Sequence, residues 1–293
     1  MQVERLLAFA VMLNTVIPAV GHAQRLVDWP VRTSALPDAI VTGAAATFWN
    51  PAGLTTGNYR AQVLVVNLRT PESLELRGLA AAGALQLDRT ILAAGLEHVG
   101  IDDFTRTDDS PSGPGAEEFD LGENHFTLAA AHRVSPAFTV GASARYTRDN
   151  LNETDPVVGV GAGFNGTFTL PWRVQVGAYA GSEADELAWA AGAEVELPSF
   201  LGDPYRIGLS YGAQADARVV GPVHRLAARF DWKERGSVSA GLAREPDVLQ
   251  AHWTPVLAAS LQLNRYTLGV VRENLVSDFG ATYTFRLQIG LGP

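Results

Sequence analysis

The sequence of 293 residues has 22 Lys and Arg against 31 Asp and Glu, a formal net charge of -9, and no Cys. A chain this acidic lacks the basic face that binds nucleic-acid phosphates, so we expect no nucleic-acid partner. The lack of Cys excludes disulfides, thiolate metal sites and cysteine nucleophiles. With 47% hydrophobic residues, the chain is long enough for one closed β-domain with a sizeable interior.

Residues 1–23 have the composition of a secretory signal peptide. Arg5 supplies the positive region, Leu6–Val20 the apolar region, and Gly21–Ala23 a small-residue cleavage site. The alternative is a membrane-anchoring helix, but this apolar segment is shorter than the roughly 20 residues that such a helix needs. We therefore expect cleavage, with the mature protein starting near Gln24.

Residues 24–59 precede the first predicted strand and combine three prolines with a short Ala/Gly-rich stretch. They are too many for a simple leader. Because the strands that follow are predicted to close into a barrel, we interpret residues 24–59 as a plug or hatch folded into it.

Period-two alternation dominates the rest of the chain. It is clearest in residues 277–290, where Phe279, Tyr283, Phe285 and Leu287 alternate with polar residues or glycines. Successive side chains of a strand point to opposite faces, so this segment has one apolar and one polar surface. About fourteen such strands are expected, near 60–68, 74–87, 90–99, 124–133, 137–148, 156–169, 172–181, 186–197, 204–214, 222–232, 236–244, 253–263, 265–273 and 277–290.

The strands of a soluble β-sandwich would also alternate between apolar and polar residues. The placement of charged and aromatic residues therefore has to distinguish a sandwich from a membrane barrel. The apolar faces often begin or end on an aromatic residue, which is typical of the girdles of membrane barrels. Charged residues fall on the opposite face, where a lumen can hydrate them, whereas an Arg at the lipid midplane would cost about 2–4 kcal/mol. The predicted lumen-facing charges are Arg145, Arg173, Arg206, Arg225, Arg229, Arg286 and Glu194. They could be ion pairs that stiffen the lumen, or a polar pathway or docking wall for the hatch.

The connections between strands alternate in length. Those after even-numbered strands are mostly tight, and those after odd-numbered strands are longer, above all the acidic stretch 100–123. Short periplasmic turns and longer outer loops are typical of bacterial outer-membrane barrels, and an even strand count places both chain ends in the periplasm. The sequence therefore predicts an all-β fold, a transmembrane antiparallel barrel of residues 60–293 in the outer membrane, with lipid as its surroundings.

The stretch Ala46–Leu54 reads ATFWNPAGL and resembles the FWNPAGL signature that opens the FadL-like barrel superfamily, most closely its PorV/PorQ branch. Further stretches agree with that branch: Phe104–Thr107, Gly115–Phe119, Phe126–Ala129 and Val140–Tyr146. The resemblance implies a fourteen-stranded outer-membrane barrel with an N-terminal hatch. Its hatch motif falls on Phe48, Trp49, Asn50, Pro51 and Gly53.

Two short motifs of enzymes occur inside predicted strands. The glycines of 161–166 fit GxGxxG, but no helix follows them as a dinucleotide site requires, so they are interpreted as small residues that let strands bend or the hatch approach. Residues 208–212 fit GxSxG, but Ser210 lies within an alternating strand rather than at a nucleophile elbow. His125 and His132 are an odd number of residues apart and cannot share a metal ion within one strand. We expect no enzyme activity, cofactor or metal.

Two functions remain open. FadL-type members pass hydrophobic compounds, which implies a hatch-gated transport barrel with a small hydrophobic ligand. PorV-type members serve type IX protein secretion, which implies a non-conducting accessory or surface scaffold whose partner is a secreted protein. The polar lumen face disfavours a fatty-acid route through the centre but leaves lateral exit possible.

Overall fold

The computed structural model describes residues 32–71, 76–106, 117–149, 157–169, 172–183, 186–197, 205–216, 221–232, 235–245, 252–274 and 280–292. The predicted signal peptide, residues 24–31 of the predicted hatch, the centre of the acidic connection and Phe279 lie outside these residues. No helix in the described ranges is long and apolar enough to cross a membrane.

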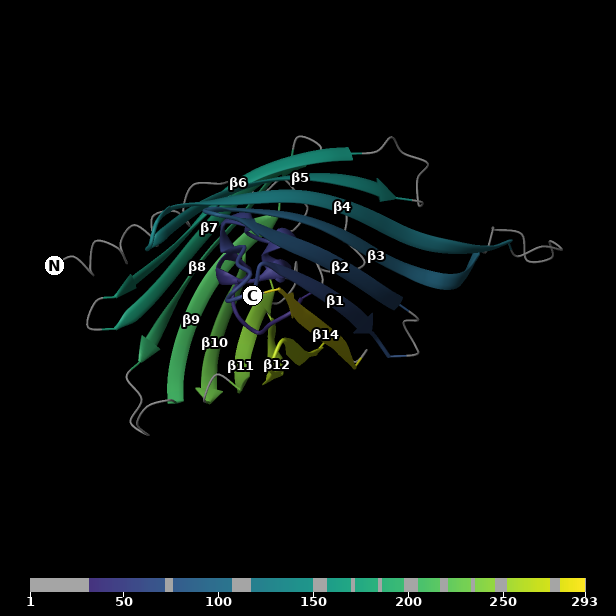
Figure 1. Ribbon diagram of the computed structural model, residues 1–293. Helices are drawn as coiled ribbons and strands as arrows, with labels where there is room; N and C mark the ends of the chain where they lie inside the picture. Colours follow the sequence, from purple (N-terminus) through teal and green to yellow (C-terminus); the bar gives the residue numbers. More distant parts are fainter. Residues whose placement is uncertain are drawn as a thin grey trace.

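Fourteen strands close into one antiparallel barrel, in which β1 pairs with β2 on one side and with β14 on the other (Figure 1). Every other strand pairs with its neighbours in sequence. The strands are β1 (Ala61–Arg69), β2 (Leu76–Leu87), β3 (Thr90–Arg106), β4 (Glu117–Ser135), β5 (Phe138–Asp149), β6 (Val157–Thr169), β7 (Arg173–Glu183), β8 (Glu186–Leu197), β9 (Tyr205–Asp216), β10 (Val223–Trp232), β11 (Gly236–Glu245), β12 (His252–Leu263), β13 (Tyr266–Asn274) and β14 (Ala281–Leu291).

The predicted number and order of strands are confirmed, but β3 and β4 are longer than expected. Their backbones continue to pair beyond a register shift between Ile101 and Phe104, up to Arg106 opposite Glu117. The prediction of a loop over 100–123 was therefore wrong at both ends. Backbone N–H and C=O groups pair whatever the side chains are, so the run of acidic residues concealed strands that periodicity could not detect.

The outer face of the barrel is apolar. Leu79, Leu209 and Phe285 keep 53%, 50% and 49% of their surface exposed, although they lie in the middle of strands. A closed barrel has no free strand edges, and an exposed apolar band of this kind is stable only against lipid. The exterior therefore matches the predicted membrane-spanning surface.

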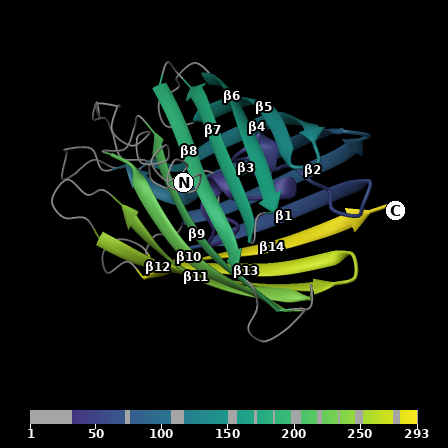
Figure 2. The ribbon, with the colours of Figure 1, turned by 90° about the vertical axis from the view of Figure 1, so that its left-hand side faces the viewer.

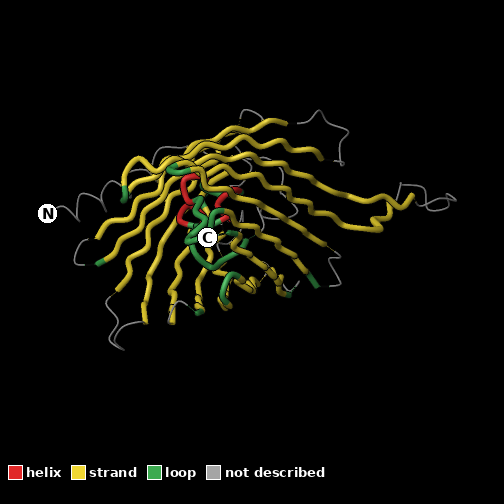
Figure 3. The backbone as a smooth tube through the Cα atoms, in the orientation of Figure 1, coloured by secondary structure: helices red, strands yellow, loops and turns green. Residues whose placement is uncertain are grey.

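Residues 32–59, here called the inner segment, lie inside the barrel (Figures 1 and 2). The segment folds into three single-turn 3-10 helices, η2 (Asp38–Ile40), η3 (Ala44–Thr47) and η4 (Pro51–Gly53), which Figure 3 shows surrounded by strands. The amide of Gly43 donates to the carbonyl of Gly53 at 3.2 Å, so the segment also closes on itself. Gly43 has a φ of 85°, a conformation that favours glycine.

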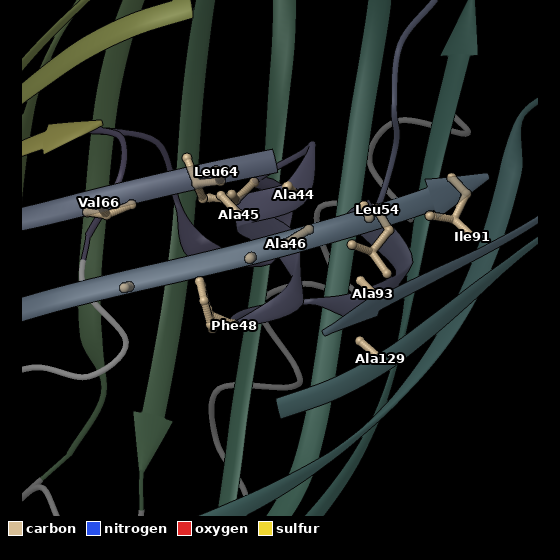
Figure 4. Close-up of a cluster of buried hydrophobic side chains, with 14 of the residues drawn as sticks. Ala44, Ala45, Ala46, Phe48, Leu54, Leu64, Val66, Ile91, Ala93 and Ala129 are labelled. Atoms are coloured by element: carbon tan, nitrogen blue, oxygen red, sulfur yellow. The ribbon is translucent and has the colours of Figure 1, made fainter. Parts of the chain in front are cut away.

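The main apolar core joins the inner segment to β1–β4. Ala44, Ala45, Ala46, Phe48 and Leu54 of the segment pack against wall residues that include Leu64, Val66, Ile91, Ala93 and Ala129 (Figure 4). The expectation of a polar inner face was thus wrong for these strands. Their inner side chains face the segment rather than water, and many are alanines because the segment leaves no room for more.

The assignment of faces can be tested by placing a charge on each side of the wall. Leu209→Arg, at the middle of β9, is expected to lower the free energy of unfolding by about 2–4 kcal/mol, since the charge enters lipid. Thr267→Arg is the control, because Thr267 is half-buried on the inner face, opposite Gln262 and Gln288. Denaturant unfolding in lipid vesicles measures both variants, and equal losses of stability would contradict the assignment.

The orientation in the membrane is tested by tags. Asp88 and Asn264, with φ of 55° and 54°, lie in the tight turns after β2 and β12, at one end of the barrel. A tag inserted between Ser110 and Ser112 should be labelled from outside intact cells, whereas a tag at Asp88 should be labelled only after lysis. Reversed labelling would place the long connections in the periplasm.

Candidate functional site in the barrel interior

Polar contacts attach the inner segment to strands around the whole barrel. At its start, Nη1 of Arg32 lies 2.8 Å from Oε1 of Glu273 on β13. Further along, Nε of Arg225 on β10 lies 3.6 Å from Oδ2 of Asp38. Both members of the second pair are almost fully buried, and such a charge is tolerated only with its partner.

The segment then crosses to the opposite wall. Gln175 of β7 donates from Nε2 to the carbonyl of Ile40 at 3.1 Å, and Arg145 of β5 donates from Nη2 to the carbonyl of Phe48 at 2.7 Å. On β1, Oε1 of Gln62 accepts from the amide of Ala44 at 2.8 Å. Side chains of the wall thus satisfy backbone groups that the short 3-10 helices leave open.

Asn50 is the polar centre of the segment and is 0% exposed. Its Nδ2 donates to the carbonyls of Ala39 at 2.8 Å and of Phe164 on β6 at 2.9 Å. Its Oδ1 accepts from the amide of Ala52 at 3.1 Å and caps η4, with Pro51 in the first helical position. One side chain therefore joins two parts of the segment to each other and to the wall.

Glycines line the wall wherever the segment approaches most closely. A Cβ at Gly163 would clash with Asn50, and one at Gly177 would clash with the carbonyl of Ala39. The same holds for Gly141, which faces the backbone of Pro51 and Ala52. Gly163 belongs to the GxGxxG stretch, so close packing of the segment accounts for at least this glycine of that motif.

The two aromatic residues of the predicted hatch motif lie at the apolar side. Phe48 is 2% exposed, and its ring occupies the space that a side chain at Gly95 would need. Trp49 is partly buried against the same core. Gly53 faces the carbonyl of Val41 so closely that any larger residue would clash.

A charged cluster occupies the other side of the interior, at the ends of β8 and β10. Arg229 contacts two carboxylates, with Nη2 at 3.2 Å from Oε1 of Glu194 and Nε at 2.9 Å from Oδ2 of Asp231. A second group follows at the end of β8. There Glu196 lies 3.5 Å from Nη1 of Arg173 and 3.4 Å from Nε of Arg206.

The interior therefore has a mainly apolar side on β1–β4, which also buries Glu97 and His125, and a charged side on β7–β10. The arginines expected on the inner face all lie on that face, on β5 and β14 as well as on β7–β10, and most contact a carboxylate or a carbonyl of the segment. Arg286 contacts the wall in another way. The aliphatic part of its side chain packs over Gly269 of β13, where a Cβ would clash with it. Sequence reasoning missed Asp231, although it shares the parity of Arg229. It also missed Asp38, which no periodicity could reveal because it lies outside the strands.

The enzyme-like motifs do not form a catalytic arrangement. Ser210 is buried within β9, and its hydroxyl donates to the carbonyl of Ala227 at 3.3 Å. Nδ1 of His125 lies 2.9 Å from Oγ1 of Thr147, on the inner face. In the ranges that the structure describes, no three His, Cys, Asp or Glu side chains come together as a metal site would require.

The contribution of Asn50 is tested by Asn50→Asp, which keeps the acceptor for Ala52 but removes both donors. Two buried carbonyls then lose their partner, and each such loss costs about 1–3 kcal/mol. We expect the inner segment to become sensitive to protease in a barrel that stays folded. Asn67→Asp on β1 is the control, and equal protease resistance of the two variants would contradict the anchoring.

The fold of the chain was compared with those of known proteins. No protein-family model matches the chain, and no curated protein matches it. Among solved structures, the CymD monoaromatic hydrocarbon channel is similar with a TM-score of 0.53 at 10% identity, over 89% of this chain and 95% of that chain. The P. putida toluene transporter TodX is similar with a TM-score of 0.51 at 11% identity, over 89% and 97%. The chain therefore has the fold of a multi-pass outer-membrane β-barrel, which the hydrocarbon channels share, whereas the PorV/PorQ branch stays a prediction.

Proposed function

We propose that the protein is an outer-membrane channel for small hydrophobic compounds and that the inner segment is its hatch. In this proposal the hatch belongs to residues 24–59 and the channel to residues 60–293. The observation that carries it is the packing of the segment across the interior, from Glu273 on β13 to Arg145 on β5. A segment in that position controls any route through the barrel.

The division of the interior favours a hydrophobic cargo. Alanines and larger aliphatic residues line the side on β1–β4, and Trp49 keeps part of its surface open there. An uncharged, apolar compound gains free energy when it leaves water and contacts this apolar side. It carries no charge that the ion pairs on β7–β10 could bind. CymD, a monoaromatic hydrocarbon channel, and TodX, a toluene transporter, have cargo of this class.

The attachment of the segment also suits a gate. Each polar contact with the wall is a single hydrogen bond or ion pair, such as that of Arg145 with the carbonyl of Phe48. Single contacts of this kind contribute about 0.5–3 kcal/mol each, so part of the segment can detach while the rest stays bound.

A reversible covalent lock tests the proposal. The Cβ of Ala39 lies 3.7 Å from the position that a Cβ would take at Gly192, within the range that disulfides span. The natural chain has no Cys, so Ala39→Cys with Gly192→Cys introduces the only pair. Uptake of labelled toluene is then measured in cells that carry the variant in the outer membrane.

The reduced variant should take up toluene faster than cells without the protein, and oxidation should abolish the difference until a reductant restores it. Gly192→Cys alone, treated identically, controls for the oxidant and for the tight contact with Pro37. Equal uptake of the oxidised and reduced forms would mean that the segment does not gate the route. Uptake at background in both forms would contradict transport and favour the non-conducting scaffold.

A further inference from the structure

Several arginines lie on the outer face of the barrel, and three of them, Arg69, Arg77 and Arg272, lie on neighbouring strands. Arg69 and Arg77 share the exposed parity of Val65 on β1 and of Leu79 on β2. Arg272 on β13 alternates with Val271, which is buried on the inner face. All three therefore point away from the lumen.

These arginines form one row across four adjacent strands. Arg272 is opposite Tyr283 of β14, Tyr283 is opposite Arg69 of β1, and Arg69 is opposite Arg77 of β2. Neighbouring strands are about 5 Å apart, so the row spans roughly 15 Å. Nε of Arg69 donates to Oδ1 of Asn67 at 2.9 Å, which holds its side chain along the wall.

The position of the row favours an anionic lipid headgroup as its partner. The row lies where β1 ends and β2 begins, at the end of the barrel that carries the longer connections. An Arg on the lipid face is cheap only at that level, where lipid headgroups rather than acyl chains surround it.

An apolar depression adjoins the row. It has a volume of about 590 Å³, and Arg272 and Tyr283 line one end of it. The residues that line it come mainly from the outer face of β9–β14, with Ala228, Ala240 and Ala259 where larger side chains would fill it. Ala240 is opposite Leu257, and Leu257 is opposite Arg272, so the depression continues the row of arginines toward the middle of the strands.

We propose that this surface binds a phosphate-bearing acylated lipid of the surrounding leaflet. Its phosphate contacts Arg69, Arg272 and Tyr283, and one acyl chain occupies the depression. Guanidinium groups match phosphate oxygens in geometry and charge, and the tyrosine hydroxyl supplies another donor. Because strands of such barrels tilt by about 35–45°, a row across them descends from headgroup level toward the membrane centre, as a lipid does.

Native mass spectrometry of the full chain in detergent, with added phosphatidic acid, tests this inference. We expect one tightly retained lipid, and about tenfold or greater loss of affinity in Arg69→Gln/Arg272→Gln, as charge-assisted contacts are removed. Arg244→Gln is the matched control, since Arg244 is also exposed on an outer face near the same end but does not line the depression. Heat-modifiable migration shows that each variant is folded.

A second pair of variants tests the acyl chain. Ala240→Phe fills the depression without changing charge and should weaken phosphatidic acid binding, whereas Ala94→Phe, exposed on β3, should not. Uncharged diacylglycerol with the same chains should bind weakly, and inorganic phosphate at millimolar concentration should not displace the lipid. Unchanged affinity in the double arginine variant or in Ala240→Phe, equal binding of diacylglycerol, or displacement by phosphate would each overturn the proposal. None of these outcomes depends on whether the barrel conducts.

Discussion

The close approach of the inner segment to the barrel wall is the constraint on which the rest of the interior depends. Backbone atoms of the segment occupy the space that side chains would take at Gly141, Gly163 and Gly177. At that separation the wall and the segment can satisfy each other's backbone groups, as Asn50 does with the carbonyl of Phe164. The small inner residues of β1–β4 and the buried pair of Asp38 and Arg225 follow from the same geometry.

The barrel was predictable because lipid outside and a packed interior within impose strict alternation on each strand. For strands such as β8, the two-residue period alone predicted the same first and last residues that the structure has. It fails in the extended parts of β3 and β4, whose sequence does not alternate. The extended parts of β3 and β4 carry charged residues without alternation, and pairing such as Arg106 with Glu117 depends on the partner strand rather than on a local pattern.

The candidate site was predictable only in part. Alternation indicates which side of the wall Arg145 and Glu194 face, but it does not reveal their partners. Arg145 reaches the carbonyl of Phe48 across 97 positions, and Asn50 reaches Phe164 across 114. The inner segment has no period, so the resemblance to a known motif pointed to Asn50, while nothing in the sequence pointed to Asp38. Contacts of irregular backbone depend on a shape that exists only once the barrel is closed.

This arrangement has a consequence for assembly. The inner segment leaves the ribosome before any strand, yet its contacts involve β6 through Asn50, β7 through Ile40 and β13 through Arg32. Contacts so distant in sequence form late, because the entropy of closing long loops must be overcome first. We therefore expect the segment to pack only after most of the wall has formed, and the pairing of β1 with β14 that closes the sheet also fixes the space it must enter. A segment that precedes every strand in the sequence thus takes its place only after most of the barrel wall has formed.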